Sequence, residues 1–522
     1  MKQIFEQWKN ADTAAFLSNL QKNQELKSVL LEETPWVLQA TSEEQQKKNI
    51  ALLFDMMRMN NELKSNLEKL QQMQSENGGF VWFKGGPDDR YITQYIVTGI
   101  GHLKKLGVST NTLVPILKGA IPYLDKKIKE DYDNLIKYKA DLSKQQISYL
   151  QIQYLYMRSF FDISLDAASK KAYDYYRAQS QKYWMKQNKY MQGMIALTLN
   201  RTGDTQTSAA ILKSLKETSI NNEEMGMYWK DQSFGYGWMW WYAPIETQAL
   251  MIEAFSEVGH DTKTVDDLRT WLLKNKQTNN WHTTKATADA CYALLLQGTN
   301  WLSAEPVVGI KLGNTTIYNT NQKSEAGTGY FKQSIPIQSV NPEMGNITVS
   351  VKQSDSKATS SSSWGAVYWQ YFEDMDKITT ASTPLQLKKK LFIEKLSDRG
   401  PVLTPVEEGT ELHVGDKIVV RIELKADRDM EYVHMKDMRA SGLEPVNVIS
   451  GYKWQGGLGY YESTKDASTN FFFNFLRKGS YVFEYPLFVT HAGDFTNGIT
   501  TIQCMYAPEF SAHSEGSRIT VE

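Results

Sequence analysis

The sequence has few cysteines, almost no net charge and no long hydrophobic run. Its 522 residues include 2 cysteines, so at most one disulfide can form and a disulfide-stabilised scaffold is excluded. The 58 basic and 59 acidic residues leave a net charge of −1, and we find no basic run longer than Lys388-Lys389-Lys390, so the basic stripe typical of nucleic-acid binding is missing. No stretch reaches about 18 apolar residues, and we therefore expect no transmembrane segment in this chain.

The first residues also lack the features of a secretion signal. Met1–Phe5 contains neither an apolar core segment nor a cleavage site of small residues, so we expect no signal peptide in this chain. Ile4, Phe5 and Trp8 already share one helical face, and no capping residue precedes them. We therefore expect the chain to be part of a longer protein, and the missing signal then says little about where that protein resides.

The composition is otherwise that of a folded protein rich in aromatic residues. The hydrophobic fraction is 41% and the charged fraction is 22%, which excludes bulk disorder. The 14 Trp, 28 Tyr and 20 Phe make up 12% of the chain. Such side chains supply either large buried areas or surfaces for sugars and partners, and composition leaves both open. At roughly 100–200 residues per domain, the length predicts about three domains.

The hydrophobic pattern divides the chain near residue 302. Before that point, apolar residues recur with helical spacing, as at Leu63, Leu67, Leu70 and Met73. From about residue 305, short runs alternate with period two and are separated by turn residues, as in 307–312, 347–351, 417–424 and 479–485. The pattern predicts a multidomain fold of helices followed by antiparallel β-sandwich domains. A serine-rich stretch at 359–363 is typical of a mobile loop.

Three segments of the helical half resemble one another. Each has a Trp beside Gly or Asn, a short polar stretch, and a Thr about one turn into an apolar helix, within residues 78–95, 235–250 and 280–290. Repeated helical hairpins bury their apolar faces only by stacking on neighbours. A loop Trp before the inner helix of each hairpin favours a closed ring, an α/α toroid of the terpenoid-cyclase type, over an open solenoid. We expect the Thr hydroxyl to bond backward to a carbonyl or to cap the helix.

The same segments resemble a known family. Gly78–Asp88 followed by Tyr91–Ile96, together with residues 32–36 and 281–294, is similar to the thioester-domain region of bacterial alpha-2-macroglobulins, of the Bacteroides type of large extracellular alpha-helical protein. Residues 364–372 resemble the β segment that follows that domain in the family. The resemblance covers essentially the whole chain. It implies a toroidal thioester-like domain at 1–302, a β unit at 303–385 that resembles the second half of the domain hosting the toroid, and a macroglobulin-like C-terminal β-sandwich at 386–522.

The resemblance to this family implies a role in protease trapping. A bait region is cut, the molecule rearranges, and a Cys–Gln thioester acylates the attacking protease. The thioester comes from a Cys-x-Glu-Gln motif, but Cys291 is followed by Tyr-Ala-Leu and Cys504 by Met-Tyr-Ala. Ahead of Glu6-Gln7, the position of the cysteine holds Ile4. Either the motif lies upstream of this chain or the protein has lost it, and in both cases we expect no thioester here.

The resemblance also predicts partners and location. It implies an endopeptidase inhibitor with a role in host defence rather than an enzyme, with no cofactor. Proteases or envelope proteins are the expected partners, beside N-terminal macroglobulin domains of the parent protein that this chain lacks. The expected location is the periplasm, the outer membrane or the exterior of a Gram-negative cell. We expect both cysteines to be reduced, and Cys291 to be buried in its apolar helix, because free cysteine is among the most buried residue types.

Aromatic residues near the repeated loops form the candidate binding surface. Aromatics at the mouth of a toroid can line a groove for sugar or peptide, or they can fill wide junctions between hairpins. The candidate residues are Trp82, Phe83, Tyr91, Trp238, Trp240, Trp241 and Trp281. No metal site is expected, because Asp289 and Cys291 point about 200° apart on a helix and so do not form a zinc site with His282.

An enzyme is the alternative hypothesis. Polysaccharide lyases and related glycan-active enzymes share the order of a helical toroid followed by β-sandwiches, which is an argument by analogy. Such an enzyme would need a cluster of Tyr, His and Asn or Arg side chains, for which Arg90, Tyr91 and His102 are the candidates. Release of unsaturated product from uronate-containing glycans would separate this hypothesis from the macroglobulin one.

Overall fold

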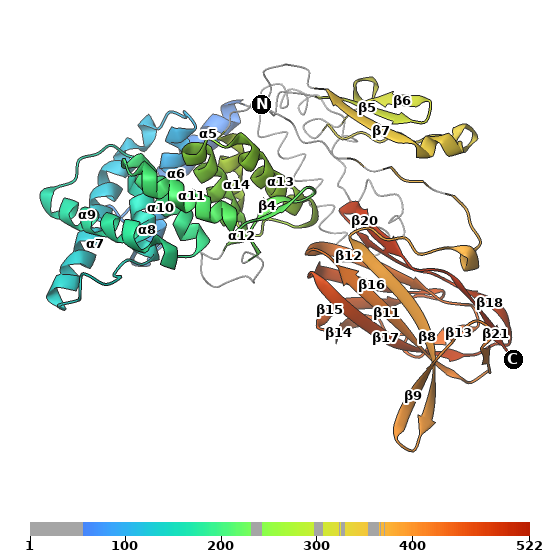
Figure 1. The fold of residues 1–522 in the computed structure, drawn as a ribbon. Coiled ribbons are helices and arrows are strands. Elements are labelled where there is room, and N and C mark those ends of the chain that lie inside the picture. The colour runs from blue at the N-terminus through green and yellow to red at the C-terminus, as the bar shows by residue number, and fades with distance from the viewer. Residues whose placement is uncertain are drawn as a thin grey trace. The chain divides into compact units, whose positions relative to one another are not determined.

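The computed structural model describes residues 56–230, 243–296, 306–322, 324, 329–352, 365, 367–369 and 371–522. Contacts divide the chain into two compact units. The first holds most of the described helices, two short two-stranded sheets and a small three-stranded sheet, and the second holds the strands from β8 (Leu385–Ser397) onwards (Figure 1). Helices followed by predominantly antiparallel sheets confirm the fold class predicted from the sequence pattern.

Among the described residues of the first unit, five helices form a closed inner ring. They are α6 (Arg90–Lys105), α8 (Tyr149–Arg158), α10 (Lys189–Arg201), α12 (Pro244–Ala254) and α14 (Thr284–Leu295). Each packs against the next along the chain. The rings of His102 on α6 and Tyr292 on α14 stack with their centroids 3.7 Å apart, which joins the last helix to the first. The predicted α/α toroid is therefore present.

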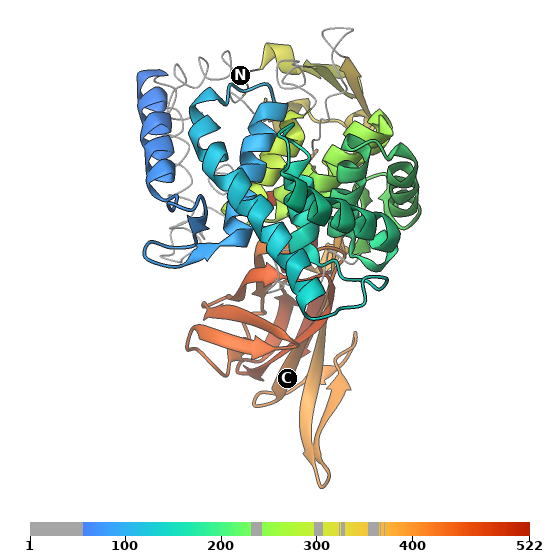
Figure 2. The ribbon, with the colours of Figure 1, turned by 90° about the vertical axis from the view of Figure 1, so that its left-hand side faces the viewer.

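The other helices alternate with the inner ones along the chain. They are α5 (Met56–Gln72), α7 (Val114–Lys137), α9 (Ala167–Tyr183), α11 (Thr205–Glu217) and α13 (Thr262–Thr278). Helix α7 packs against α6 and α9, and α11 packs against α10, as the two ribbon views show (Figures 1 and 2). No helix in the described part of the chain is long and apolar enough to cross a membrane.

Three inner helices begin in the same way, which explains the repeated sequence pattern. Thr93, Thr247 and Thr287 each donate a hydroxyl hydrogen bond to the carbonyl of the N-cap residue four positions earlier, at 2.7, 2.7 and 3.1 Å. Two of these N-cap residues, Asp89 and Thr283, also accept a hydrogen bond from a backbone N–H of the first turn. The predicted role of the threonines is confirmed.

Aromatic side chains fill much of the helical core. The largest fully buried ones are Trp229, Tyr154, Tyr156, Tyr176 and Phe80. Each such ring removes about 150–250 Å² from water, which contributes about 4–6 kcal/mol of transfer free energy. Two of these side chains have hydrogen-bonded polar atoms: the Trp229 indole donates to a carbonyl at 2.9 Å, and the Tyr154 hydroxyl donates to a carboxylate at 2.6 Å.

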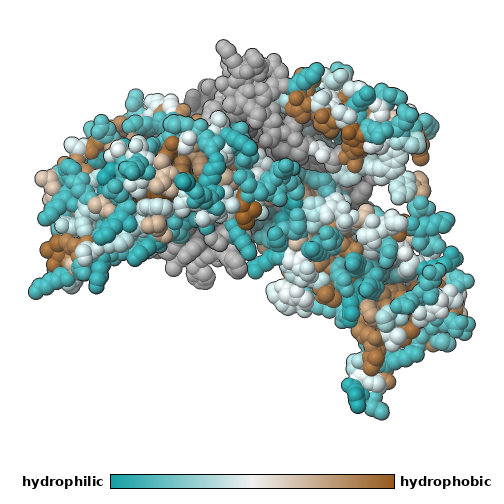
Figure 3. Space-filling view, in the orientation of Figure 1, coloured by the Kyte–Doolittle hydropathy of each residue, from teal (hydrophilic) through white to brown (hydrophobic). Residues whose placement is uncertain are grey.

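The small sheet of the first unit has one apolar face. Strands β5 (Val307–Leu312), β6 (Thr315–Tyr318) and β7 (Ile347–Lys352) are antiparallel in the order β6-β5-β7. The register aligns Ile310 with Ile317 and Val349, so that apolar side chains share a face. On β7 the side chains of this face remain largely exposed, and hydrophobic residues gather over these strands in Figure 3.

The second unit is a β-sandwich. Its five-stranded sheet has the order β13-β17-β11-β8-β9, with bounds Leu443–Pro445, Gly479–Val489, Lys417–Ala426, Leu385–Ser397 and Gly400–Pro405. Its six-stranded sheet has the order β14-β15-β16-β12-β19-β20, with bounds Gly451–Gln455, Leu458–Thr464, Ser468–Leu476, Met430–Met438, Thr500–Cys504 and Ala507–His513. Alternate residues of β11, such as Ile418, Val420 and Ile422, lie in the core.

A third, small sheet departs from the antiparallel prediction. It joins β10 (Glu411–Leu412), β21 (Ser517–Val521) and β18 (Gly493–Asn497), and β10 pairs with β21 in parallel. The prediction of antiparallel pairing holds for both sheets of the sandwich. The short parallel pair links two segments that are far apart in sequence, which period-two patterning does not reveal.

One other expectation needs correction, and another is not tested. The described residues of 364–372, expected to be a β segment, form no strand, and Phe372 is 101% exposed. A strand needs a neighbour for its backbone groups, and an apolar pattern alone does not supply one. The serine-rich stretch at 359–363 lies outside the described residues.

The basic run is divided between the two faces of β8. The Lys389 side chain is buried, with Nζ 2.8 Å from a carboxylate oxygen of Asp437, and it also donates to the carbonyls of Met438 and Gly498. Lys388 and Lys390 point away from the core because successive residues of a strand face opposite sides. The run is therefore not a basic stripe.

Candidate functional site

The exposed part of the predicted aromatic surface lies on one short loop. Trp82 and Phe83 are 59% and 65% exposed and follow β1 (Phe80–Val81), before β2 (Asp88–Asp89). The Trp82 ring stacks on Tyr91 of α6 at a centroid distance of 6.1 Å, and Tyr91 stacks on Tyr95 at 6.3 Å. Burial is the main cause that raises the pKa of Tyr91 to about 12, so its hydroxyl is protonated at neutral pH. The exposed indole is thus supported by two further rings.

The base of this loop is tightly anchored. Asp88 accepts hydrogen bonds from the Ser75 hydroxyl and from the Asn77 side-chain amide. Gly78 has a φ of +92°, and a Cβ there would lie 2.1 Å from the Gly119 carbonyl oxygen, so only glycine fits. These contacts fix the start of the loop and leave Trp82 and Phe83 at its tip.

The structure does not bring all the predicted aromatics to this place. Trp281 is half-buried and packs against the core of the helical unit. The other three, Trp238, Trp240 and Trp241, lie outside the described residues. The candidate surface therefore consists, in the described part of the chain, of Trp82 and Phe83 supported by Tyr91.

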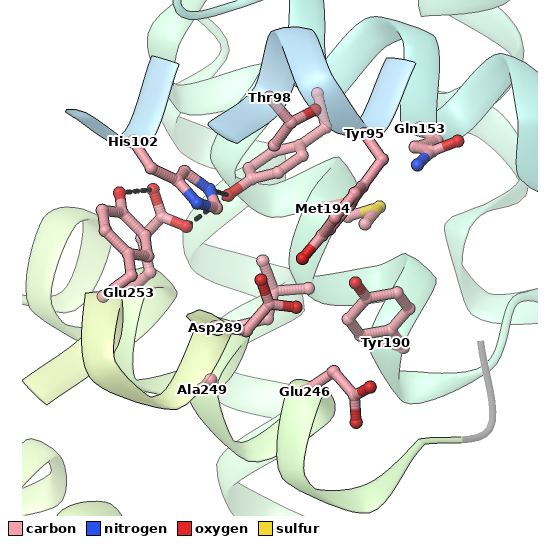
Figure 4. Close-up of a pocket in the computed structure, with 13 residues that line it drawn as sticks. Tyr95, Thr98, His102, Gln153, Tyr190, Met194, Glu246, Ala249, Glu253 and Asp289 are labelled. Carbon is pink, nitrogen blue, oxygen red and sulfur yellow. Dashed lines mark hydrogen bonds between the residues drawn. The ribbon is translucent and has the colours of Figure 1, made fainter. Parts of the chain in front are cut away.

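A cavity at the centre of the helical ring is a site that sequence reasoning missed. Its volume is about 30 Å³, enough for about two water molecules. Side chains from all five inner helices line it, as Figure 4 shows for ten labelled residues. They include three carboxylates and four tyrosines, namely Glu246, Glu253, Asp289, Tyr95, Tyr156, Tyr190 and Tyr292. A signal was available in the sequence, because Glu246 and Glu253 interrupt the otherwise apolar run of α12.

One polar cluster at the cavity is centred on Glu253. This residue is 1% exposed, and its carboxylate accepts hydrogen bonds from Arg201 Nη2 at 2.6 Å, from the Tyr292 hydroxyl at 2.8 Å and from the Tyr156 hydroxyl. Arg201 also pairs with Glu257 through two bonds of 2.7 and 2.8 Å. Burial acts to raise the pKa of Glu253, but nearby cations, Arg201 first, hold it below its usual range. The ionised carboxylate links α12 to α8, α10 and α14.

His102 acts as a fixed donor beside this cluster. Its Nε2 lies 3.0 Å from the Tyr156 hydroxyl oxygen. Because the Tyr156 hydroxyl donates its own proton to Glu253, its oxygen accepts a hydrogen bond from His102, and the His102 proton therefore lies on Nε2. Burial lowers the pKa of His102, so the imidazole is neutral. Burial, reinforced by Arg201, also lowers the pKa of the neighbouring Lys105 to about 8.

A second cluster, which we name the Lys285 cage, surrounds an ammonium group. Lys285 Nζ lies 3.0 Å from an Asp289 carboxylate oxygen and 3.5 Å from a Glu246 oxygen. It also lies 5.6 and 5.5 Å from the ring centroids of Tyr95 and Tyr190. Burial acts to lower the pKa of Lys285, but Tyr190 and the two carboxylates hold it well above its usual range. The cage therefore contains a permanently charged ammonium between two carboxylates and two aromatic rings.

The residues proposed for a glycan enzyme do not come together. Arg90 and Tyr91 lie in the first turn of α6, and His102 lies about 18 Å further along the same helix. Arg90 is bonded to Asp131 at 2.5 Å and to Gln94 at 3.0 Å, and neutral His102 is buried. Arg90, Tyr91 and His102 therefore do not form one catalytic group facing a substrate.

The two cysteines are free, as predicted, but Cys291 is not buried. On α14 the buried side chains include Ala290, Tyr292 and Ala293, and Cys291 points to solvent. The small apolar residues around this helix concealed which side faces the core. Cys504 is buried, and burial raises the pKa of its thiol to about 12. Among the described residues, no group of three or more His, Cys, Asp or Glu side chains could hold a metal ion.

Comparison with known proteins identifies the second unit. The family model described as the bacterial alpha-2-macroglobulin MG10 domain matches residues 385–509, which span β8 to β20 of the sandwich. In the sequence, the matched sandwich follows the ring of helices. Residues 385–509 of this chain are therefore similar to the MG10 domain of bacterial alpha-2-macroglobulins.

Solved structures of this family align with the chain at low identity. The chain is similar to trypsin-activated alpha-2-macroglobulin from Escherichia coli, with 12% identity and a TM-score of 0.38 over 98% of this chain and 31% of that one. It is also similar to Salmonella alpha-2-macroglobulin reacted with methylamine, with 13% identity and a TM-score of 0.29 over 100% of this chain and 30% of that one. The chain thus spans about a third of the length of these proteins. A search of curated proteins found no match.

Proposed function

We propose that this chain is the C-terminal portion of an alpha-2-macroglobulin-like protein of the cell envelope that contributes to protease inhibition by non-covalent binding. The observation that carries the proposal is the MG10 match at 385–509, placed after a closed ring of helices. The helical ring takes the role of a thioester-like domain, but neither cysteine belongs to a Cys-x-Glu-Gln motif. Any attachment that this chain itself makes to a protease is then reversible.

Residues 303–385 are proposed to be part of a domain that other segments of the parent protein complete. The support is the apolar face of β5, β6 and β7, on which Ile347, Val349 and Val351 are 48%, 59% and 47% exposed. Apolar sheet faces of this kind are normally covered by a second layer. The N-terminal macroglobulin domains expected in the parent protein are the proposed neighbours of this chain, and its proposed location is the periplasm, the outer membrane or the cell exterior.

The binding surface is proposed to be centred on Trp82 and Phe83. Large exposed aromatics mark interaction sites, and a rigid indole supported by Tyr91 loses little conformational entropy when a partner binds. The partner is a protease or an envelope protein. The exposure of Trp82 and Phe83 and the anchoring of their loop support this assignment. Trp238, Trp240, Trp241 and Trp281 were predicted from the sequence to belong to the same surface, and they remain predictions.

Binding measurements with the whole chain test this proposal. Catalytically inactivated trypsin and elastase are titrated against the wild-type chain and against a Trp82→Ala/Phe83→Ala variant. We expect reversible binding that the double substitution weakens at least about tenfold, which corresponds to about 1.4 kcal/mol. Met185→Ala is the matched control, because Met185 is 71% exposed and lies on another part of the helical unit. Absence of wild-type binding to either protease would refute the inhibitory function, and an equal loss in the control would refute the surface.

A further inference from the structure

We propose that the Lys285 cage is a binding site for a primary ammonium group, which the chain occupies with its own side chain and thereby closes the helical ring. The site is formed by Asp289, Glu246, Tyr95 and Tyr190, and all four also line the central cavity. This inference does not depend on the proposed protease binding.

The geometry around the nitrogen matches the needs of an ammonium ligand. Two carboxylates accept N–H groups or balance the charge at 3.0 and 3.5 Å, and two tyrosine rings face the cation at distances below about 6 Å. The side chains of Asp289 and Glu246 are 13% and 7% exposed, so little water competes for the cation. These features select a compact cation that donates hydrogen bonds. A quaternary ammonium lacks N–H groups, and sodium is strongly hydrated and donates no hydrogen bonds.

The helices that supply the cage explain what the ligand does. Tyr95 comes from α6, Tyr190 from α10, Glu246 from α12, and Asp289 from α14, the same helix as Lys285. The ammonium therefore lies where the last inner helix meets the first. Figure 4 shows Tyr95, Tyr190, Asp289 and Glu246 around the same part of the cavity. A tethered cation at this position holds together the helices that close the ring.

Truncation of the lysine makes the site available to a free ligand. In Lys285→Ala, the missing atoms are Cγ, Cδ, Cε and Nζ, and n-propylammonium supplies the same three carbons and one nitrogen. The thermal unfolding of the helical unit is followed by circular dichroism at 222 nm in equal concentrations of n-propylammonium, tetramethylammonium and sodium chloride. If n-propylammonium binds with a Kd of about 10 mM, 100 mM of it raises the folding equilibrium constant of the variant about tenfold.

Two variants separate this effect from general salt stabilisation. Lys285→Met fills the space without a charge and is expected to respond equally to all three salts. Lys170→Ala is the matched control, because Lys170 forms the same i,i+4 pair with Asp174 but is exposed. A specific gain with n-propylammonium in Lys285→Ala alone supports the proposal. An equal response of Lys285→Ala to the three salts, a similar gain in Lys285→Met, or failure of Lys285→Ala to fold even when refolded with n-propylammonium overturns it.

Discussion

Replacing Glu253 with glutamine tests the ion-pair network at the centre of the helical ring. The substitution keeps the shape of the side chain but removes the charge that Arg201 contacts at 2.6 Å. Removing one partner of a buried ion pair costs about 3–5 kcal/mol. Arg201 retains its two bonds to Glu257, so we expect a loss near the lower end, about 3 kcal/mol. In a unit of this size that loss lowers the midpoint of thermal unfolding by about 6–12 °C.

The assay is thermal unfolding followed at 222 nm, because the described helices lie almost entirely in the first unit. Glu257→Gln is the matched control, since the Glu257 side chain is 19% exposed and leaves the Arg201–Glu253 pair intact. It is expected to cost about 1–2 kcal/mol, less than Glu253→Gln, because Glu257 is partly exposed and water can solvate Arg201 and Lys105 once the charge is removed. A midpoint for Glu253→Gln within 1–2 °C of wild type, or an equal effect of the two substitutions, would refute the reasoning that Glu253 is the centre of the network.

The remaining predictions concern the second unit and the two thiols. Lys389→Met should destabilise the sandwich by about 3–5 kcal/mol, because it leaves Asp437 buried without its cation. Lys388→Met, at the exposed neighbouring position, is the control and should change stability by less than about 0.5 kcal/mol in calorimetry. Equal changes in stability for the two variants would be inconsistent with the buried pair. Burial lowers the pKa of His434 to about 4, so the unfolded chain takes up its proton first as the pH falls below 6.5. Stability of the sandwich should therefore decline by about 2.5 kcal/mol from pH 7.5 to pH 4.5, and His434→Gln should remove this part of the decline in urea unfolding. An unchanged pH dependence would show that His434 titrates normally. Iodoacetamide should label Cys291 in the native chain but Cys504 only after denaturation, and mass spectrometry showing native labelling of Cys504 would contradict its burial.

Local hydrogen bonds and the alternation of side chains along strands could be predicted from the sequence. The threonines at 93, 247 and 287 each follow an N-cap residue by four positions, so their backward hydrogen bonds depend on a single helical turn. The alternation of strands such as 417–424 likewise fixed which side chains enter the sandwich core. The family resemblance rested on residues 32–36, 78–96, 281–294 and 364–372, and the MG10 match at 385–509 supports it from another part of the chain.

Features that depend on contacts between several helices or strands could not be predicted from the sequence. The central cavity depends on five helices that are up to 200 residues apart, and the sequence shows only that acidic residues interrupt an apolar run. Cys291 could not be placed, because the small apolar residues of α14 surround the helix instead of marking one face. The burial of Lys389 depends on Asp437, which lies on another strand of the sandwich. Tertiary partners decide all three cases.

Incubation of the chain with active trypsin or elastase, followed by denaturing electrophoresis and an activity assay on a protein substrate, tests the central claim most directly. We expect the chain to reduce cleavage of the substrate. We also expect that no covalent conjugate with the protease survives denaturation, because the chain has no Cys-x-Glu-Gln motif. Full protease activity at saturating chain would contradict the inhibitory function. A conjugate that resists denaturation and disappears after methylamine treatment would contradict the absence of a thioester.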